Sequence, residues 1–134
     1  MRIIRRILLL WIAASLLASC SSGDRPAAPE GAAKPPDENA AIAALKEINR
    51  AQADFIRRTR RYAQRTDELI ADSLLKGEPA AEGYTIQMLP SADAVSYTVS
   101  ATPRTPDARH FFTDKSGVIR AEKGKPASAE SPEP

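Results

Sequence analysis

The stretch RHFFTDKSGVIR, residues 109–120, contains two short runs typical of strands, separated by residues typical of a turn. Residues 110–113 are rich in aromatic side chains and predict a strand, and residues 118–122 predict a second strand. Between them, residues 114–117 predict a turn, because Asp favours the first turn position and Gly accepts the backbone angles at its end. The stretch therefore predicts an antiparallel hairpin.

Two further strands are predicted before this hairpin, in GYTIQML (residues 83–89) and VSYTVSATP (residues 95–103). Apolar side chains occupy every second position, as in a half-buried strand: Tyr84, Ile86 and Met88 in the first stretch, and Val95, Tyr97, Val99 and Ala101 in the second. Prolines separate these strands. Because the connections are short, we expect consecutive strands to pair antiparallel.

Helical periodicity replaces this alternation on the N-terminal side. An amphipathic helix is predicted to about Thr59, with Asp37 as its N-cap and a buried stripe at Ala41, Leu45, Ile48, Gln52 and Phe55. A second helix is predicted from Thr66 or Asp67 to Gly77. We expect a bend near residues 62–63, although one continuous helix is the alternative.

These elements predict an α+β domain. An N-terminal amphipathic helix, with a second short helix, should pack on an antiparallel meander of three to four strands. The expected boundaries are a leader at residues 1–19, a disordered tether at 20–36, the folded domain at 37–122 and a disordered tail at 123–134. Both flanking segments are rich in Pro, Ala, Ser and Gly, a composition that buries little apolar surface.

The chain opens with a segment typical of export leaders. Three arginines, Arg2, Arg5 and Arg6, precede an apolar run shorter than a membrane-spanning helix requires. The sequence Leu17-Ala18-Ser19-Cys20 closes this run, and Cys20 is the only cysteine in the chain. A single cysteine excludes an intrachain disulfide and a C-x-x-C metal or redox site.

This cysteine sequence resembles the lipobox of bacterial lipoproteins. The resemblance implies that the Cys20 thiol receives a diacylglycerol, that the leader is cut before Cys20, and that the new amino group takes an acyl chain such as palmitate. An ordinary signal peptide with a chance cysteine and an uncleaved amphipathic anchor are the alternatives. Ser21 favours the outer membrane over the inner one, because Asp at that position retains Gram-negative lipoproteins at the inner membrane.

The net charge of the chain does not indicate nucleic-acid binding. The chain has 19 basic and 17 acidic side chains, and without the three leader arginines the balance is 16 to 17, a net charge of −1. A basic surface of the kind that binds phosphate backbones is therefore not indicated.

Several stretches together resemble type IV pilin-like proteins and pseudopilins. They are AIAALKEINRAQADF (residues 41–55), YAQRTDELI (62–70), GYTIQM (83–88), YTVSATP (97–103) and RHFFTDKSGVIR (109–120). The resemblance covers residues 40–121 and implies a pilin-like helix-and-sheet domain near a type II secretion or type IV pilus-like system. Pilins keep an apolar assembly helix after their leader, whereas here a lipid anchor takes its place.

Candidate site residues are few. Arg57, Arg58, Arg60 and Arg61 are a candidate patch for an anionic partner, with a solvated helix face as the alternative. His110, the only histidine, has no cysteine or nucleophile motif near it and is interpreted as a structural residue. One of Phe111 and Phe112 should enter the core, and the other is a candidate contact residue.

The sequence predicts a non-enzymatic, lipid-anchored protein of the bacterial cell envelope. No metal-ligand spacing, phosphate-binding loop or nucleophile motif is recognisable, so we expect no cofactor and no small-molecule substrate. The expected role is binding or scaffolding of an envelope or secretion-system protein, at the membrane and facing the periplasm or the surface. Two alternatives are an accessory to an envelope hydrolase and a structural surface lipoprotein without a dedicated ligand.

Overall fold

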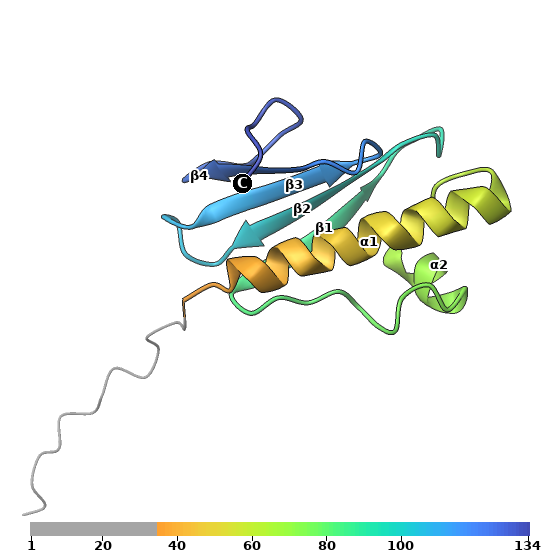
Figure 1. Cartoon of the computed structure of the whole chain (residues 1–134), viewed down its shortest axis with the longest axis horizontal. Helices are drawn as coiled ribbons and strands as arrows, with labels where there is room; N and C mark the ends of the chain where they lie inside the picture. The colour runs from red at the N-terminus through yellow and green to blue at the C-terminus, as the bar shows by residue number, and fades with distance from the viewer. Residues whose placement is uncertain (1–34) are drawn as a thin grey trace, which may run out of the picture. The chain divides into compact units, whose positions relative to one another are not determined.

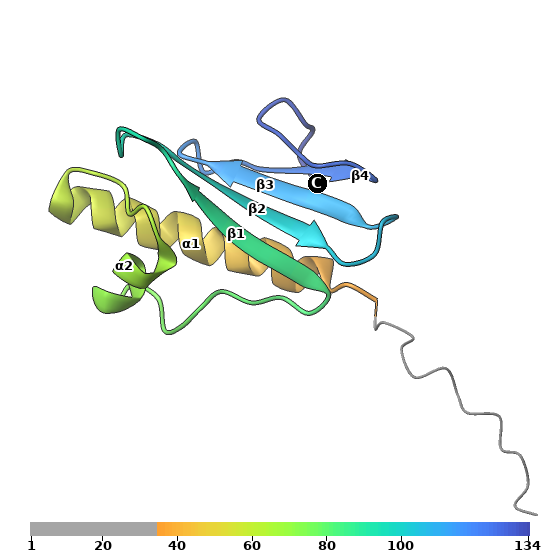
Figure 2. The ribbon, with the colours of Figure 1, turned by 180° about the vertical axis from the view of Figure 1, so that it is seen from behind.

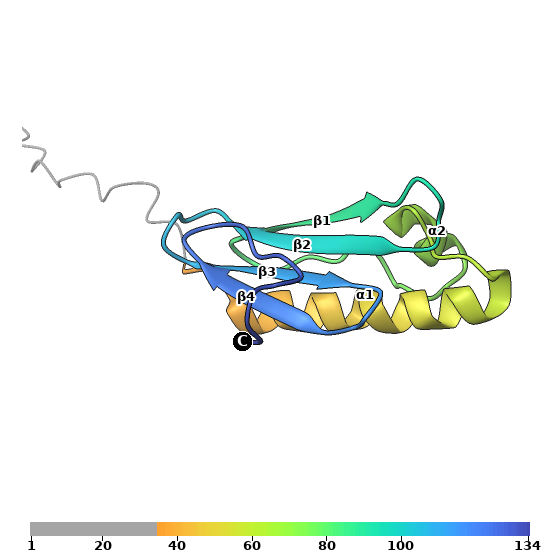
Figure 3. The ribbon, with the colours of Figure 1, turned by 90° about the horizontal axis from the view of Figure 1, so that it is seen from above.

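A computed structural model describes residues 35–134, and the predicted leader, Cys20 and residues 20–34 of the predicted tether lie outside the described residues. The predicted α+β class is confirmed: the described chain has two helices and one four-stranded antiparallel sheet (Figure 1). Helix α1 packs along one face of the sheet (Figure 3).

Helix α1 spans Glu38–Thr59 and begins at the predicted N-cap, where the Asp37 carboxylate accepts a hydrogen bond from the Ala40 amide at 2.9 Å. Its buried residues recur at spacings of three and four and include Leu45, Ile48 and Phe55. The helix ends at Arg60, which adopts a left-handed conformation with φ of 64°. This residue turns the chain and gives two separate helices in place of a continuous one.

Helix α2 spans Thr66–Ala71, so the prediction that it continues to Gly77 is wrong. Ser73 adopts a left-handed conformation with φ of 57°, and its amide donates to the Ile70 carbonyl at 2.9 Å. The Leu74 amide donates to the Leu69 carbonyl at 2.8 Å. These two bonds form a Schellman motif, which ends the helix six residues before the glycine.

The strands are β1 (Tyr84–Pro90), β2 (Tyr97–Pro103), β3 (Arg109–Asp114) and β4 (Ile119–Lys123), and they pair in chain order. The predicted meander is thus present with four strands. Val95 does not belong to it: this residue is 58% exposed and precedes β2. Ala94, with φ of 55°, and the bond from the Val95 amide to the Asp93 carboxylate at 3.2 Å hold this segment in a turn.

The hairpin between β3 and β4 has the predicted turn. The Gly117 amide donates to the Asp114 carbonyl at 2.9 Å, and the Ser116 amide donates to the Asp114 carboxylate at 2.8 Å. Gly117 has φ of 75°, which only glycine adopts without strain. The hairpin register pairs Phe111 with Ala121 and Phe112 with Arg120.

The core lies between α1 and the sheet. Side chains from the helices and from β2 and β3 are fully buried there, including Leu45, Ile48, Leu69, Val99 and Phe111. Two aromatic contacts extend this core, with ring centroids 5.7 Å apart for Tyr84 and Phe111 and 5.0 Å apart for Tyr62 and Tyr97.

The C-terminal segment differs from the predicted disordered tail. The Ala121 amide at the outer edge of β4 donates to the Pro132 carbonyl at 2.8 Å, and Arg120 donates to the Ser131 carbonyl at 2.8 Å. Ser131 is only 5% exposed and donates to the Glu122 carboxylate at 3.1 Å. Backbone pairing with a sheet edge needs no apolar side chains, so composition alone did not indicate this packing.

Candidate binding surface

The face of the sheet that points away from α1 is a candidate binding surface, and we call it the open face. Figure 2 views the molecule with the sheet in front of α1, and neither helix of residues 35–134 lies over this face. Its side chains are mostly polar and come from alternate positions of all four strands: Thr85, Gln87, Leu89, Thr98, Ser100, Thr102, His110, Phe112, Asp114, Arg120 and Glu122.

Phe112 lies in the middle of the open face. The pairing register places Ser100 on one side of it and Arg120 on the other. Phe112 is half-buried, whereas its neighbour Phe111 is 1% exposed and belongs to the core. The alternation of side chains along β3 therefore divides the two phenylalanines between core and surface, as the sequence predicts.

His110 also lies on the open face, half-buried and opposite Glu122 on β4. The Glu122 carboxylate accepts a hydrogen bond from Ser131, which ties this strand pair to the C-terminal segment. Within residues 35–134, no group of three His, Cys, Asp or Glu side chains is placed to hold a metal ion.

The four arginines of the candidate patch lie at the C-terminal end of α1 and just beyond it. Arg57 pairs with Asp54 at 3.1 Å, and Arg61 pairs with Glu68 at 2.5 Å. Arg58 and Arg60 are exposed and have no ion-pair partner among the described residues. Two of the four charges are thus matched locally, and two face solvent.

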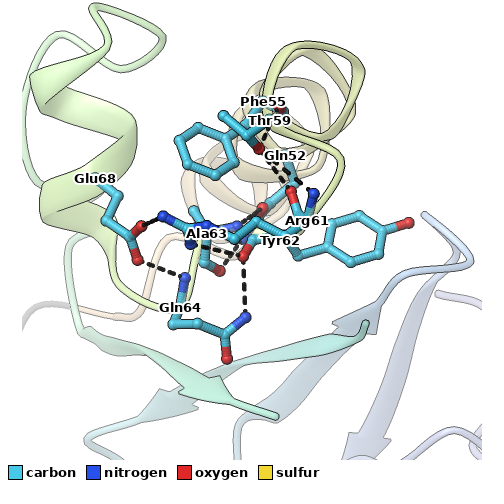
Figure 4. A network of polar contacts seen from close by, with 8 residues as sticks. All are labelled: Gln52, Phe55, Thr59, Arg61, Tyr62, Ala63, Gln64 and Glu68. Atoms are coloured by element: carbon cyan, nitrogen blue, oxygen red, sulfur yellow. Dashed lines mark hydrogen bonds and ion pairs between the residues drawn. The ribbon is translucent and has the colours of Figure 1, made fainter. Parts of the chain in front are cut away.

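The Arg61 side chain contacts both the end of α1 and helix α2 (Figure 4). Its guanidinium lies 5.2 Å from the centroid of the Phe55 ring, and its ion pair with Glu68 joins the end of α1 to α2. The backbone amide of Gln64 donates to the Glu68 carboxylate at 2.8 Å. The Arg61 hydrogen bond is the main reason that the pKa of Glu68 is lowered.

Gln52 holds the loop that follows α1 (Figure 4). Its side chain is fully buried and makes two hydrogen bonds of 2.9 Å with the backbone of Ala63, one as donor and one as acceptor. The sequence places Gln52 in an apolar stripe, and its polar role was not predicted. The side-chain oxygen of Gln64 nearby is buried and has no hydrogen-bond partner in the described part of the chain.

Asn49 makes a second polar link from α1, to the β3–β4 hairpin. Its amide nitrogen donates to the Thr113 hydroxyl at 2.8 Å and to the Gly117 carbonyl at 3.1 Å, and its oxygen accepts from the Tyr97 hydroxyl at 3.0 Å. Thr113 is fully buried, and burial raises the pKa of Tyr97. Asn49 and Gln52 both lie in the INRAQ stretch, residues 48–52.

The other end of α1 is fixed by an ion pair. Arg109 contacts one Glu38 oxygen through two nitrogens, at 3.0 and 2.5 Å, and this hydrogen bonding lowers the pKa of Glu38. The Tyr84 hydroxyl donates to the Arg109 carbonyl at 2.9 Å, and burial raises the pKa of Tyr84 to about 12.

The carboxylates of α2 are held by neighbouring side chains. Asp67 pairs with Arg65 at 2.5 Å and Glu68 pairs with Arg61, so each carboxylate lies beside a cation. The open face and the exposed Arg58 and Arg60 present hydrogen-bonding and charged groups at the surface.

Comparison with protein-family models, curated proteins and solved structures gives no match for this chain. Its class is therefore defined by its fold, an α+β domain with one helix-covered sheet face and one open face. None of the helices in residues 35–134 combines the length and apolar character of a membrane span.

Proposed function

We propose that this chain is a lipid-anchored protein of the bacterial cell envelope whose domain binds or scaffolds another envelope protein. The observation that carries the proposal is Leu17-Ala18-Ser19-Cys20, which directly follows a basic and then apolar leader. Acylation of Cys20 would supply two or three long chains, and each buried methylene contributes about 0.8 kcal/mol to membrane affinity. The role proposed for the domain is non-enzymatic and uses no cofactor.

We further propose that the domain is pilin-like, with an amphipathic N-terminal helix. The order of elements supports this, because one long helix precedes an antiparallel meander that ends in the FFTDKSG hairpin. The polar links of Asn49 and Gln52 give the INRAQ stretch a physical role in such a fold, since they join the helix to the hairpin and to the following loop.

A partner in a type II secretion or type IV pilus-like system is the specific form of this proposal. A pilin enters its filament through an apolar assembly helix, whereas α1 begins with Asp37 as N-cap and Glu38 in its first turn. The domain would therefore act beside such a machine and not within its filament. Ser21 favours the outer membrane as its location, with the domain facing the periplasm or the surface.

The arginine end of α1 is a candidate contact for an acidic partner. Arg58 and Arg60 lie near the C-terminus of a 22-residue helix, about 33 Å from its start at 1.5 Å per residue. We propose an acidic protein surface as the partner of these two charges, because neither has an ion-pair partner among residues 35–134.

A crosslinking pull-down from intact cells tests this function, with the native chain compared with Cys20→Ser and a Ser22→Ala control. We expect the native and Ser22→Ala chains to stay in the membrane fraction and to recover the same envelope proteins, and Cys20→Ser to lose both. Membrane retention of Cys20→Ser would contradict the anchor. Recovery of no specific protein by the retained native chain would contradict the binding role.

A further inference from the structure

The two edges of the sheet differ. At the outer edge of β4, the Ala121 amide donates to the Pro132 carbonyl, so the C-terminal segment covers that edge. The outer edge of β1 has no comparable backbone partner within residues 35–134. An uncovered edge presents N–H and C=O groups with which another extended chain can pair.

The backbone bonds identify which groups point outward from β1. The Arg104 amide donates to the Gly83 carbonyl at 2.8 Å, and this bond extends the ladder between β1 and β2. The direction of the backbone N–H and C=O groups alternates along an antiparallel ladder. Those of Thr85, Gln87 and Leu89 therefore bond to β2, whereas those of Ile86 and Met88 point outward from the sheet edge. The same alternation, carried across the sheet, directs the Ala121 amide outward from β4, where it does bond to Pro132.

The outward donors are therefore confined to two positions. The Tyr84 amide already donates to the Ala81 carbonyl at 3.1 Å, and Pro90 has no N–H. Ile86 and Met88 each offer one N–H and one C=O. Edge strands are commonly protected by charged side chains, but residues 84–89 contain none.

A hollow of about 270 Å³ lies beside these groups. Ile86–Met88 line one side of it, and residues 65–67 and 78–79 line the other. A chain that pairs with β1 would enter a space that already has a second wall, and its side chains would meet that wall.

The second wall carries an unbalanced carboxylate. Arg65 and Asp67 pair with each other at 2.5 Å. The Thr66 hydroxyl lies 3.0 Å from each Glu78 oxygen, but no cation of residues 35–134 pairs with Glu78. A basic side chain on the incoming segment would complement Glu78, whereas the β1 strand of a second copy would bring no charge.

We propose that the outer edge of β1 binds an extended segment of a partner protein by strand addition, with a Lys or Arg side chain of that segment placed against Glu78. Main-chain bonds from Ile86 and Met88 supply affinity, and the wall at residues 65–67 and 78–79 selects the side chains. The inference rests on the proposed binding function and names the chemistry of the partner, but it does not require the lipid anchor.

The test uses the full chain in detergent micelles and a fluorescent decapeptide of alternating Val and Thr with one central Arg. At a saturating concentration of this probe, we expect amide hydrogen exchange at Ile86 and Met88 to slow at least tenfold, while Gln87 and Leu89, already paired with β2, change less. N-methylation of alternate probe amides on the pairing side should weaken binding about tenfold or more, because each methyl removes a backbone donor.

Two matched variants test the charge. Glu78→Gln should weaken binding of the Arg probe about threefold, which is typical of an exposed ion pair. Glu47→Gln, on the exposed side of α1, should leave it unchanged. The same probe with Glu in place of Arg should bind more weakly than the Arg probe to the native chain.

Several results would overturn the inference. They are absence of probe binding, equal binding of the N-methylated probe, equal binding by Glu78→Gln, and protection of Ile86 and Met88 by self-association of the chain without any probe. The Cys20→Ser chain should bind the probe as well as the native chain does. Loss of its membrane retention together with unchanged probe binding thus separates this inference from the anchor.

Discussion

Two amide side chains on α1, Asn49 and Gln52, connect the helix to backbone in two distant segments. Gln52 pairs with both backbone groups of Ala63, and Asn49 reaches the Gly117 carbonyl in the hairpin turn. Buried polar groups contribute little when satisfied but cost about 1–3 kcal/mol each when a partner is removed. A different arrangement of helix, loop and hairpin would break these hydrogen bonds. The links therefore favour the native arrangement more strongly than apolar packing alone would.

Gln52→Met should lower the free energy of unfolding by about 2–4 kcal/mol, because the Ala63 amide and carbonyl would both lose their buried partner. Urea denaturation measures this change. Gln87→Leu, at an exposed glutamine on β1, is the matched control and should change stability by less than about 0.5 kcal/mol. Equal effects of the two substitutions would contradict the role assigned to Gln52.

The ion pair of Glu38 and Arg109 predicts a pH dependence. The pKa of Glu38 is lower in the folded chain, so its contribution is present above the unfolded pKa, near 4.5, and is lost as the pH falls through the folded pKa. Because both side chains are more than a third exposed, we expect less than about 1 kcal/mol. Glu38→Gln should therefore destabilise the chain at pH 7 and have a smaller effect near pH 3.

Urea denaturation of the native chain and Glu38→Gln at both pH values measures this dependence. Glu47→Gln, an exposed α1 variant without an ion pair in the described chain, serves as its control. A Glu38→Gln effect that is as large at pH 3 as at pH 7 would contradict the assignment.

At the scale of elements, the start of β1 and the start of α1 support each other. The Asp37 amide donates to the Glu82 carbonyl at 2.9 Å, and Pro36 lies against Gly83. A Cβ on Gly83 would lie 2.6 Å from the Pro36 Cα, and Gly83 has φ of 76°. The last residue of the predicted tether is thus part of the folded domain.

Gly83→Ala should lower the free energy of unfolding by about 2–4 kcal/mol, through a left-handed alanine and a backbone clash together. Gly117→Ala isolates the first effect, because Gly117 has a similar φ of 75° and open space around it, and it should lose about 1 kcal/mol. Thermal unfolding of both variants makes the comparison. If Gly83→Ala loses no more stability than Gly117→Ala, the predicted clash with Pro36 is wrong.

The elements themselves could be predicted from the sequence, because α1 and the strands bury residues at helical or alternating spacing. The end of α2 and the start of β2 could not. Ser73 ends α2 in a left-handed conformation that serine rarely adopts, and Asp93 and Ala94 turn the chain before β2. These backbone conformations depend on how the flanking segments pack, and the local sequence pattern does not indicate that packing.

At the scale of the whole molecule, the C-terminal segment completes the sheet by covering the outer edge of β4. Only the order of strands determines which edges exist, so neither this cover nor the exposed edge of β1 could be predicted from composition. Phe112 and the arginines at the end of α1 could be recognised from the sequence as candidate contacts. Glu78, Ile86 and Met88 could not, because only the fold brings them around one hollow.

Removing residues 124–134 should destabilise the domain by about 1–3 kcal/mol, because the hydrogen bonds of Ser131 and Pro132 with β4 are lost. Removing only residues 133–134 keeps those bonds and should have little effect. Urea denaturation of the two truncated chains distinguishes these expectations. Equal stability of the native and longer-truncated chains would show that the segment contributes nothing to folding.

Intact mass spectrometry of the chain purified from membranes tests the proposed lipid anchor. We expect a mature chain that begins at Cys20, with a diacylglycerol on its thiol and an acyl chain on its amino group. A chain that keeps residues 1–19, or that begins elsewhere with an unmodified cysteine, would contradict the proposed anchor.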